Sequence, residues 1–225
     1  MSCVDPVELG TRDWSNLRKS EKVLKSNYRD ESSGKELVAY TVPNQQIPSL
    51  DKYEYLVVNE NEVCACWVGG QIKDILSSGA YKLKTRVGVQ LSWISIVPKW
   101  VCYGVPCGIV KTLDGIELGF NGNLSFYINR ALAREFLLTY GQAGMQVTME
   151  SVVKSIREKV QSQSILEIIM KIPFENFSKN PTLVGTTISS RLKGILLKSG
   201  IELLHFDIKS YILCKEKKLV KVLKG

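Results

Sequence analysis

Thr112-Leu-Asp-Gly-Ile-Glu-Leu-Gly-Phe-Asn-Gly-Asn-Leu-Ser-Phe-Tyr-Ile128 alternates between apolar and polar side chains. The apolar set of alternate positions comprises Ile116, Leu118, Phe120, Leu124, Phe126 and Ile128. The other set comprises Glu117, Asn121, Asn123, Ser125 and Tyr127. Because successive side chains of a strand point to opposite faces, the segment predicts a long strand with one buried and one wetter face. The Asp114-Gly115 pair before it favours a tight turn, so we expect a hairpin.

The chain before this hairpin predicts short strands separated by turn residues. The expected strands cover residues 55–58, 63–68, 71–76, 81–85, 87–96 and 101–111. Beyond Asn129 the apolar spacing becomes helical, which predicts helices over residues 132–140, 149–160 and 181–199, with a short turn at 165–170. Residues 201–212 return to alternation. This order predicts an α+β fold, with a mostly antiparallel sheet of hairpins and about three helices packed on one face.

The predicted elements divide the chain into three segments. Residues 1–36 are polar and charged and form an expected N-terminal appendage. Residues 37–213 hold the strands and helices of one α+β domain. Residues 214–225 form a short basic C-terminal stub.

The composition is that of a folded protein with excess positive charge. Of the 225 residues 44% are hydrophobic, and the formal net charge is +8. This charge favours an anionic partner, either phospholipid or nucleic acid, although a solvated lysine-rich coat gives the same total. Aromatic residues lie in apolar strands and are not interleaved with Arg and Lys, so nucleic acid is the less favoured partner.

The sequence also bears on location. Polar residues follow Met1, and no stretch offers about 18 uninterrupted apolar residues, so neither a signal peptide nor a membrane-spanning helix is expected. We therefore expect a cytoplasmic protein whose contact with the inner face of a membrane is peripheral or made through a partner.

The sequence offers no candidate catalytic residue. His205 is the single histidine, which excludes a multi-histidine metal site and makes a Ser/His/Asp triad improbable. No phosphate-binding loop motif is present. We therefore expect no enzymatic activity and no cofactor.

The cysteines leave one metal hypothesis open. The only candidate zinc ligands are Cys64 and Cys66 on one face of a strand, with Cys102 and Cys107 on another strand pair. A disulfide and small buried hydrophobic residues are the alternatives. Cys3 and Cys214, near the ends of the chain, are candidates for acyl anchors.

The C-terminal stub is the expected membrane or partner contact. Its lysines are Lys215, Lys217, Lys218, Lys221 and Lys224, and they accompany the apolar residues Leu219, Val220, Val222 and Leu223. As a helix, this segment would be basic and amphipathic, suited to an anionic membrane or a partner helix. The alternative is a solvated tail.

Three blocks of sequence, in a fixed order, carry a family resemblance. The first contains Tyr55-Leu-Val-Val-Asn-Glu-Asn-Glu-Val63, Gly70-Gln-Ile-Lys-Asp-Ile75 and Ser78-Gly-Ala-Tyr-Lys-Leu83. The second joins Thr112-Leu-Asp-Gly-Ile-Glu-Leu118 to Leu124-Ser-Phe-Tyr-Ile128, and the third covers residues 190–208. Together they resemble the SPFH (band 7, prohibitin-homology) domain of stomatins, prohibitins and flotillins. One departure is Asn129-Arg130, where the family usually has Asp-Pro.

The resemblance carries functional expectations. The lead-in Val42-Pro-Asn-Gln-Gln-Ile-Pro-Ser49 is similar to that of a soluble prokaryotic branch without a membrane hairpin. It implies a non-enzymatic scaffold that forms homo-oligomers or recruits membrane-associated partner proteins at a membrane surface. The alternative is a soluble domain that binds nucleic acid or another anionic ligand through its basic surface.

Overall fold

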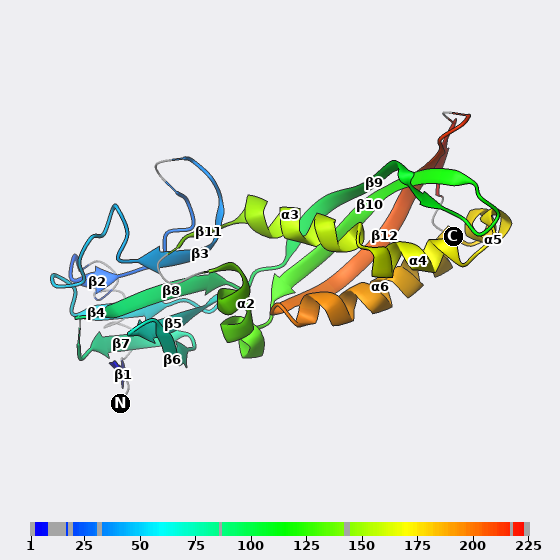
Figure 1. Ribbon diagram of the computed structural model, residues 1–225. Coiled ribbons are helices and arrows are strands. Elements are labelled where there is room, and N and C mark those ends of the chain that lie inside the picture. Colours follow the sequence, from blue (N-terminus) through cyan, green and yellow to red (C-terminus); the bar gives the residue numbers. More distant parts are fainter. Residues whose placement is uncertain are drawn as a thin grey trace. The chain divides into compact units, whose positions relative to one another are not determined.

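The computed structural model describes residues 3–8, 17, 20–30, 33–85, 87–141, 145–216 and 218–222 (Figure 1). The fold is mixed α+β with predominantly antiparallel sheets, which confirms the predicted class. The chain forms two compact units. Unit 1 comprises Met1–Val97 and Ile128–Val152, and unit 2 comprises Pro98–Tyr127 and Val153–Gly225. The single domain expected over residues 37–213 is therefore divided between them.

Unit 1 is built from two sheets and a short helical segment. The five-stranded sheet has the order β11-β3-β8-β5-β6, and the four-stranded sheet has the order β1-β7-β4-β2. The strands are β1 Val4–Val7, β2 Val23–Leu24, β3 Leu37–Val42, β4 Tyr55–Val58, β5 Glu62–Val68, β6 Gln71–Leu76, β7 Gly79–Leu83, β8 Val89–Ser95 and β11 Val147–Thr148. The helical segment contains η1 Arg130–Leu132 and α2 Ala133–Tyr140.

One hydrophobic cluster joins the two sheets of unit 1. It contains Leu56 from the four-stranded sheet and Trp93 from the five-stranded sheet, both fully buried. The indole N–H of Trp93 also donates a hydrogen bond of 3.0 Å to the Val57 carbonyl oxygen. The cluster includes Val4 and Leu24 from the N-terminal segment that was expected as an appendage. The described part of that segment therefore supplies strands and core residues to unit 1.

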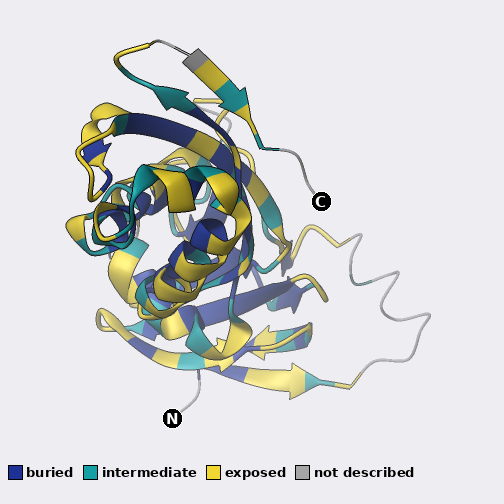
Figure 2. Ribbon diagram, turned by 90° about the vertical axis from the view of Figure 1, so that its right-hand side faces the viewer, coloured by how far each residue is buried: buried dark blue, intermediate teal, exposed yellow. Residues whose placement is uncertain are grey.

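Unit 2 places helices along a four-stranded sheet of order β13-β12-β10-β9 (Figure 1). Its strands are β9 Lys99–Lys111, β10 Glu117–Ile128, β12 Ile201–Leu213 and β13 Lys218–Lys221. Its helices are α4 Gln163–Met170, α5 Phe174–Lys179 and α6 Pro181–Leu197, together with α3 Met149–Val160, which begins in unit 1. Buried residues run along these strands and the helical turns that face them (Figure 2).

The alternation of residues 112–128 is confirmed in β10. The apolar set is buried from Leu118 to Ile128, whereas Asn121 is exposed and Tyr127 is half-buried. Ser125 departs from the prediction, since it lies on the polar face and is nonetheless buried. The helix predicted over residues 149–160 is also confirmed, as α3, and the Thr148 hydroxyl accepts the Ser151 N–H at 3.2 Å at its start.

The turn between β9 and β10 is held by its aspartate. Oδ1 of Asp114 accepts the Thr112 hydroxyl at 2.5 Å and the Phe174 N–H, at the start of α5, at 3.0 Å. Gly115 has a φ of +79°, a conformation that glycine adopts without strain. The carboxylate therefore ties the hairpin to the first turn of α5.

We expect this tie to weaken on acidification. The hydrogen bond from Thr112 lowers the pKa of Asp114, and the Phe174 N–H acts in the same direction. A lowered carboxyl pKa contributes stability above the unfolded-state pKa, and this contribution is lost as the pH falls through the folded-state value. The amide resonance of Phe174, followed by NMR, should titrate below the ordinary aspartate range. Titration in the ordinary range, or loss of the effect only on global unfolding, would contradict this assignment.

Candidate functional site

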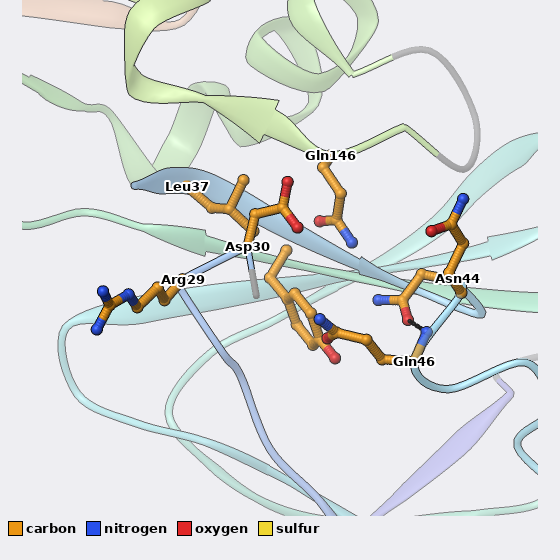
Figure 3. A pocket seen from close by; sticks show the side chains of 8 residues that line it. Arg29, Asp30, Leu37, Asn44, Gln46 and Gln146 are labelled. Atoms are coloured by element: carbon orange, nitrogen blue, oxygen red, sulfur yellow. Dashed lines mark hydrogen bonds between the residues drawn. The ribbon is translucent and has the colours of Figure 1, made fainter. Parts of the chain in front are cut away.

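A polar pocket of about 340 Å³ lies in unit 1 (Figure 3). It is formed by the segment before β3, by β3 itself, by the loop that follows it and by the residue before β11. The lining residues are Arg29, Asp30, Leu37, Tyr40, Asn44, Gln45, Gln46 and Gln146. The pocket therefore combines side-chain amides with one acid and one base.

Two of the amides have structural roles. Oδ1 of Asn44 accepts the N–H groups of Gln46 and Ile47 at 2.9 and 2.8 Å, which closes the loop after β3. The side chain of Gln146 bonds both the N–H and the carbonyl of Thr41, at 2.9 and 3.0 Å. It thus extends the short pairing of β11 along the edge of β3.

The side-chain amides of Gln45 and Gln46 determine which ligand groups the pocket can bind. Within the described part of the chain, the side-chain amides of Gln45 and Gln46 have no hydrogen-bond partner. An amide both donates and accepts, so this wall suits neutral polar groups. The lining residues offer hydrogen-bond donors and acceptors to a polar ligand.

A second polar cluster in unit 1 surrounds Glu62, which is only 3% exposed. Its carboxylate accepts the Ser26 hydroxyl at 2.8 Å, the Tyr28 hydroxyl at 2.9 Å, and the backbone and side-chain N–H groups of Asn59, both at 2.7 Å. Burial and the charge of Glu62 raise the pKa of Tyr28. A glutamate in the pattern Glu60-Asn-Glu62 is typical of a solvated turn, but Glu62 is buried. With its acceptors engaged, this carboxylate anchors the N-terminal segment to β5.

The sheet of unit 2 carries an exposed aromatic group. Trp100 is 67% exposed on β9, next to buried Val101, and its ring centroid lies 5.9 Å from that of His205 on β12. Nε2 of His205 lies 3.3 Å from Oδ2 of Asp207, whose Oδ1 accepts the Asn123 N–H at 2.9 Å. The side chain of His205 is half-buried, so it lies on a face of β12 that solvent reaches.

The structure contradicts the candidate zinc set. Cys64 and Cys66 are buried in unit 1, whereas Cys107 in unit 2 forms a disulfide with Cys214. Cys102 is an exposed free thiol. Among the described residues, no group of three or more His, Cys, Asp or Glu side chains is arranged to hold a metal ion. Cys64 and Cys66, with one residue between them on β5, both point into the apolar core of unit 1 and pack there as small hydrophobic residues.

The disulfide also contradicts an acyl-anchor role for Cys214. Its Cys107 end lies close to Gly119 of β10, where an added Cβ would come within 2.9 Å of the Cys107 backbone nitrogen. The bond joins residues 107 positions apart in the sequence and fastens the end of β12 to β9. Disulfides persist in oxidising surroundings, so a cytoplasmic location would leave both residues as thiols.

We expect reduction of this disulfide to destabilise unit 2. A cross-link that closes so long a loop restricts the unfolded chain, and its removal costs about 2–4 kcal/mol. The Cys107→Ser/Cys214→Ser variant should show that loss in urea unfolding monitored by Trp fluorescence, and dithiothreitol should lower the stability of only the unsubstituted protein. Equal stability of the two proteins under oxidising conditions would contradict the assignment.

The predicted basic stub is a strand and not a helix. β13 pairs antiparallel with β12, with Leu219 opposite Ile212 and Lys221 opposite Ser210. Lys215 and Lys221 are exposed, and Lys218 begins the strand. Lys217 and Lys224 lie outside the described residues. Backbone groups of residues 218–221 bond to β12 and not to water, so this part of the stub belongs to the unit 2 sheet.

Formal charge is concentrated in unit 2. Its sequence contains 16 Lys and Arg residues against 8 Asp and Glu, whereas unit 1 contains 14 of each class. The entire net charge of +8 therefore belongs to unit 2. The sequence alone does not reveal this uneven distribution of charge, because each unit is assembled from two separate stretches of chain.

None of the helices in the described ranges is both long enough and apolar enough to cross a bilayer. Comparison of the sequence with protein-family models and with curated proteins found no match to either.

Proposed function

We propose that the protein is a non-enzymatic scaffold of the SPFH type, which contacts an anionic membrane surface through unit 2. There it self-associates or recruits membrane-associated partner proteins. The observation that carries the proposal is the concentration of the whole net charge in unit 2. A unit with a twofold excess of basic residues is drawn to anionic lipid by attraction of about 1 kcal/mol for each Lys or Arg near the surface.

The β12–β13 hairpin supplies the contact. Leu219 is 57% exposed and lies between Lys218 and Lys221 on β13, and the exposed Lys215 precedes it in the turn. An apolar side chain flanked by lysines inserts below the headgroups while the ammonium groups stay at the phosphates. Cys214 lies in the turn of this hairpin, and its disulfide fastens that turn to Cys107 of β9. The hairpin is therefore presented as a fixed element of the sheet.

A second candidate is binding of single-stranded nucleic acid by the same unit. The observation that favours it is Trp100, whose exposed ring lies beside His205 in the unit that carries the excess charge. Exposed aromatic rings on a basic sheet stack with bases. Both candidates use the charge, but only the second requires the Trp100 ring.

Flotation of the full chain with vesicles separates the two candidates. Phosphatidylcholine vesicles with and without phosphatidylglycerol, combined with light scattering after size exclusion, measure lipid binding and self-association. We expect flotation only with the anionic vesicles. A protein that ignores both vesicle types but binds an oligonucleotide with a steep salt dependence would overturn the scaffold proposal and support the second candidate.

Charge reversal locates the contact. We expect Lys215→Glu/Lys221→Glu to reduce anionic-vesicle binding at least about tenfold, because four units of charge are removed from the proposed contact. The matched control is Lys73→Glu/Lys82→Glu, which makes the same change on exposed strand positions of unit 1. An equal loss in both variants would show a response to net charge alone and would exclude the hairpin as the contact.

A further inference from the structure

Strand β9 of unit 2 contains a bulge opposite a single residue of β10. The pairing moves from Val105 to Val110 on β9 while it advances by only two positions on β10. Residues 106–109 therefore lie opposite Gly119 alone, and all four of them are exposed. A bulge directs side chains away from the regular ladder positions, and this one carries Cys107.

The bulge brings Cys107 to Cys214 although β10 lies between their strands in the sheet. Two strands on either side of a third are about 9.5 Å apart. The Cα atoms of the two cysteines are only 5.6 Å apart. The N–H of Cys214 donates to the Glu117 carbonyl oxygen of β10 at 3.1 Å, and the Cys107 backbone lies against Gly119. The bulge and the missing side chain of Gly119 thus accommodate the disulfide.

The disulfide is open to solvent thiols, because Cys107 is exposed and Cys214 is half-buried in the turn between β12 and β13. Exposed disulfides are reduced more easily than buried structural ones. The described backbone attachments of β13 are its four-residue ladder with β12 and the bond from the Val222 N–H to the Lys209 carbonyl oxygen, at 2.8 Å. A short strand at the edge of a sheet opens at low free-energy cost once its turn is released.

We propose that the Cys107–Cys214 disulfide is a reversible redox switch for the β12–β13 hairpin, opened by low-molecular-weight thiols and closed by their disulfides. The inference rests on the proposed membrane contact, because this hairpin carries Leu219 and its neighbouring lysines. In the disulfide form the contact is fixed to the sheet. In the dithiol form β13 separates transiently from β12, so binding to anionic lipid must also order the hairpin and is weaker.

Glutathione opens the switch in two exchange steps. A glutathione thiolate attacks Sγ of the exposed Cys107, forms a mixed disulfide and releases Cys214 as a thiolate. A second glutathione thiolate attacks the glutathione sulfur of that mixed disulfide, releases the Cys107 thiolate and forms oxidised glutathione. Two electrons pass to the cysteines, and the two protons of the glutathione thiols reach the cysteine thiolates through solvent. Oxidised glutathione closes the switch by the reverse steps.

Reduced glutathione tests the switch on the full chain under native conditions. Alkylation and mass spectrometry should find Cys107 and Cys214 as thiols after reduction, and their linked peptide should return with oxidised glutathione. Hydrogen exchange of the Val222 amide should be at least about tenfold faster in the dithiol form. A bond that glutathione breaks only after urea unfolds the protein would overturn the proposal, and so would unchanged Val222 exchange after reduction.

Vesicle flotation connects the switch to the membrane contact. The disulfide form should bind phosphatidylglycerol vesicles at least about tenfold more tightly than the dithiol form. Cys107→Ser/Cys214→Ser should bind like the dithiol form and ignore glutathione, whereas Cys102→Ser, at the exposed free thiol of β9, should keep the full response. If neither form binds, the proposed membrane function fails, and Val222 exchange alone decides the switch. Equal binding by the two forms would refute redox control of the contact.

Discussion

Replacement of Gly122 by alanine should cost at least about 3 kcal/mol of folding stability, because the added methyl group has no room. A Cβ at this position would lie 1.7 Å from the carbonyl oxygen of Asp207 and 2.8 Å from the hydroxyl of Tyr103. That hydroxyl donates a hydrogen bond of 2.8 Å to the same carbonyl. The first atom in the way belongs to the backbone, so β10 and β12 must separate to accommodate the substitution.

The control is Gly104→Ala on the neighbouring strand. Gly104 pairs with Asn121 across the β9–β10 ladder, and a Cβ there would meet only the Cβ of Asn121, at 4.0 Å. This change should be neutral or slightly stabilising, since it restricts the unfolded chain. Urea unfolding curves of both variants test the comparison, together with solvent exchange of the Asn123 amide, which is hydrogen-bonded to Asp207. Equal midpoints for the two variants would mean that Asp207 does not approach β10 in this way.

The close approach of Gly122 to Asp207 could not be predicted from the alternation of side chains along the sequence, because it joins two distant strands. Alternation predicted β10 and β6 because a two-residue period depends only on neighbouring positions, and β6 spans Gln71–Leu76 as expected. The sequence predicted residues 214–225 as a basic helix or a solvated tail and missed β13. This strand is only four residues long, which is too short for alternation to distinguish a strand from a helix or a tail. Residues 218–221 become a strand because they pair with β12, and this pairing cannot be predicted from residues 214–225 alone.

Pairing between distant residues explains the other differences. The contact of Cys107 with Cys214 requires β9 and β12 to flank β10, and the sequence predicts these strands without their order. The polar pocket is built by residues from three separate segments, and only the loop-forming role of Asn44 carries a local signal, through its bonds to residues two and three positions later. Charge segregation likewise depends on a division into units that interleaves four stretches of chain.

Glu62 is buried because residues distant in the sequence bind its carboxylate. Next to Asn59, Glu60 and Asn61 it has the sequence context of a solvated turn. Two of its hydrogen bonds come from Ser26 and Tyr28, in the N-terminal segment that the sequence assigned to an appendage. Removing an acceptor that serves four donors at a buried site therefore affects two parts of unit 1 together.

We expect Glu62→Ala to destabilise the protein by about 3–4 kcal/mol, because hydrogen bonds to a charged group are worth about 1.5–3 kcal/mol each and part of that is regained by hydration. Glu62→Gln should cost less, since its amide keeps the shape and still bonds the Ser26 and Tyr28 hydroxyls. The matched control is Glu60→Ala, which removes an exposed carboxylate two residues away and should change stability by less than about 0.5 kcal/mol. Urea unfolding gives the ranking, and limited proteolysis near residues 20–30 reports release of the N-terminal segment. If Glu62→Ala and Glu60→Ala behave alike, the carboxylate of Glu62 faces solvent and does not hold that segment to β5.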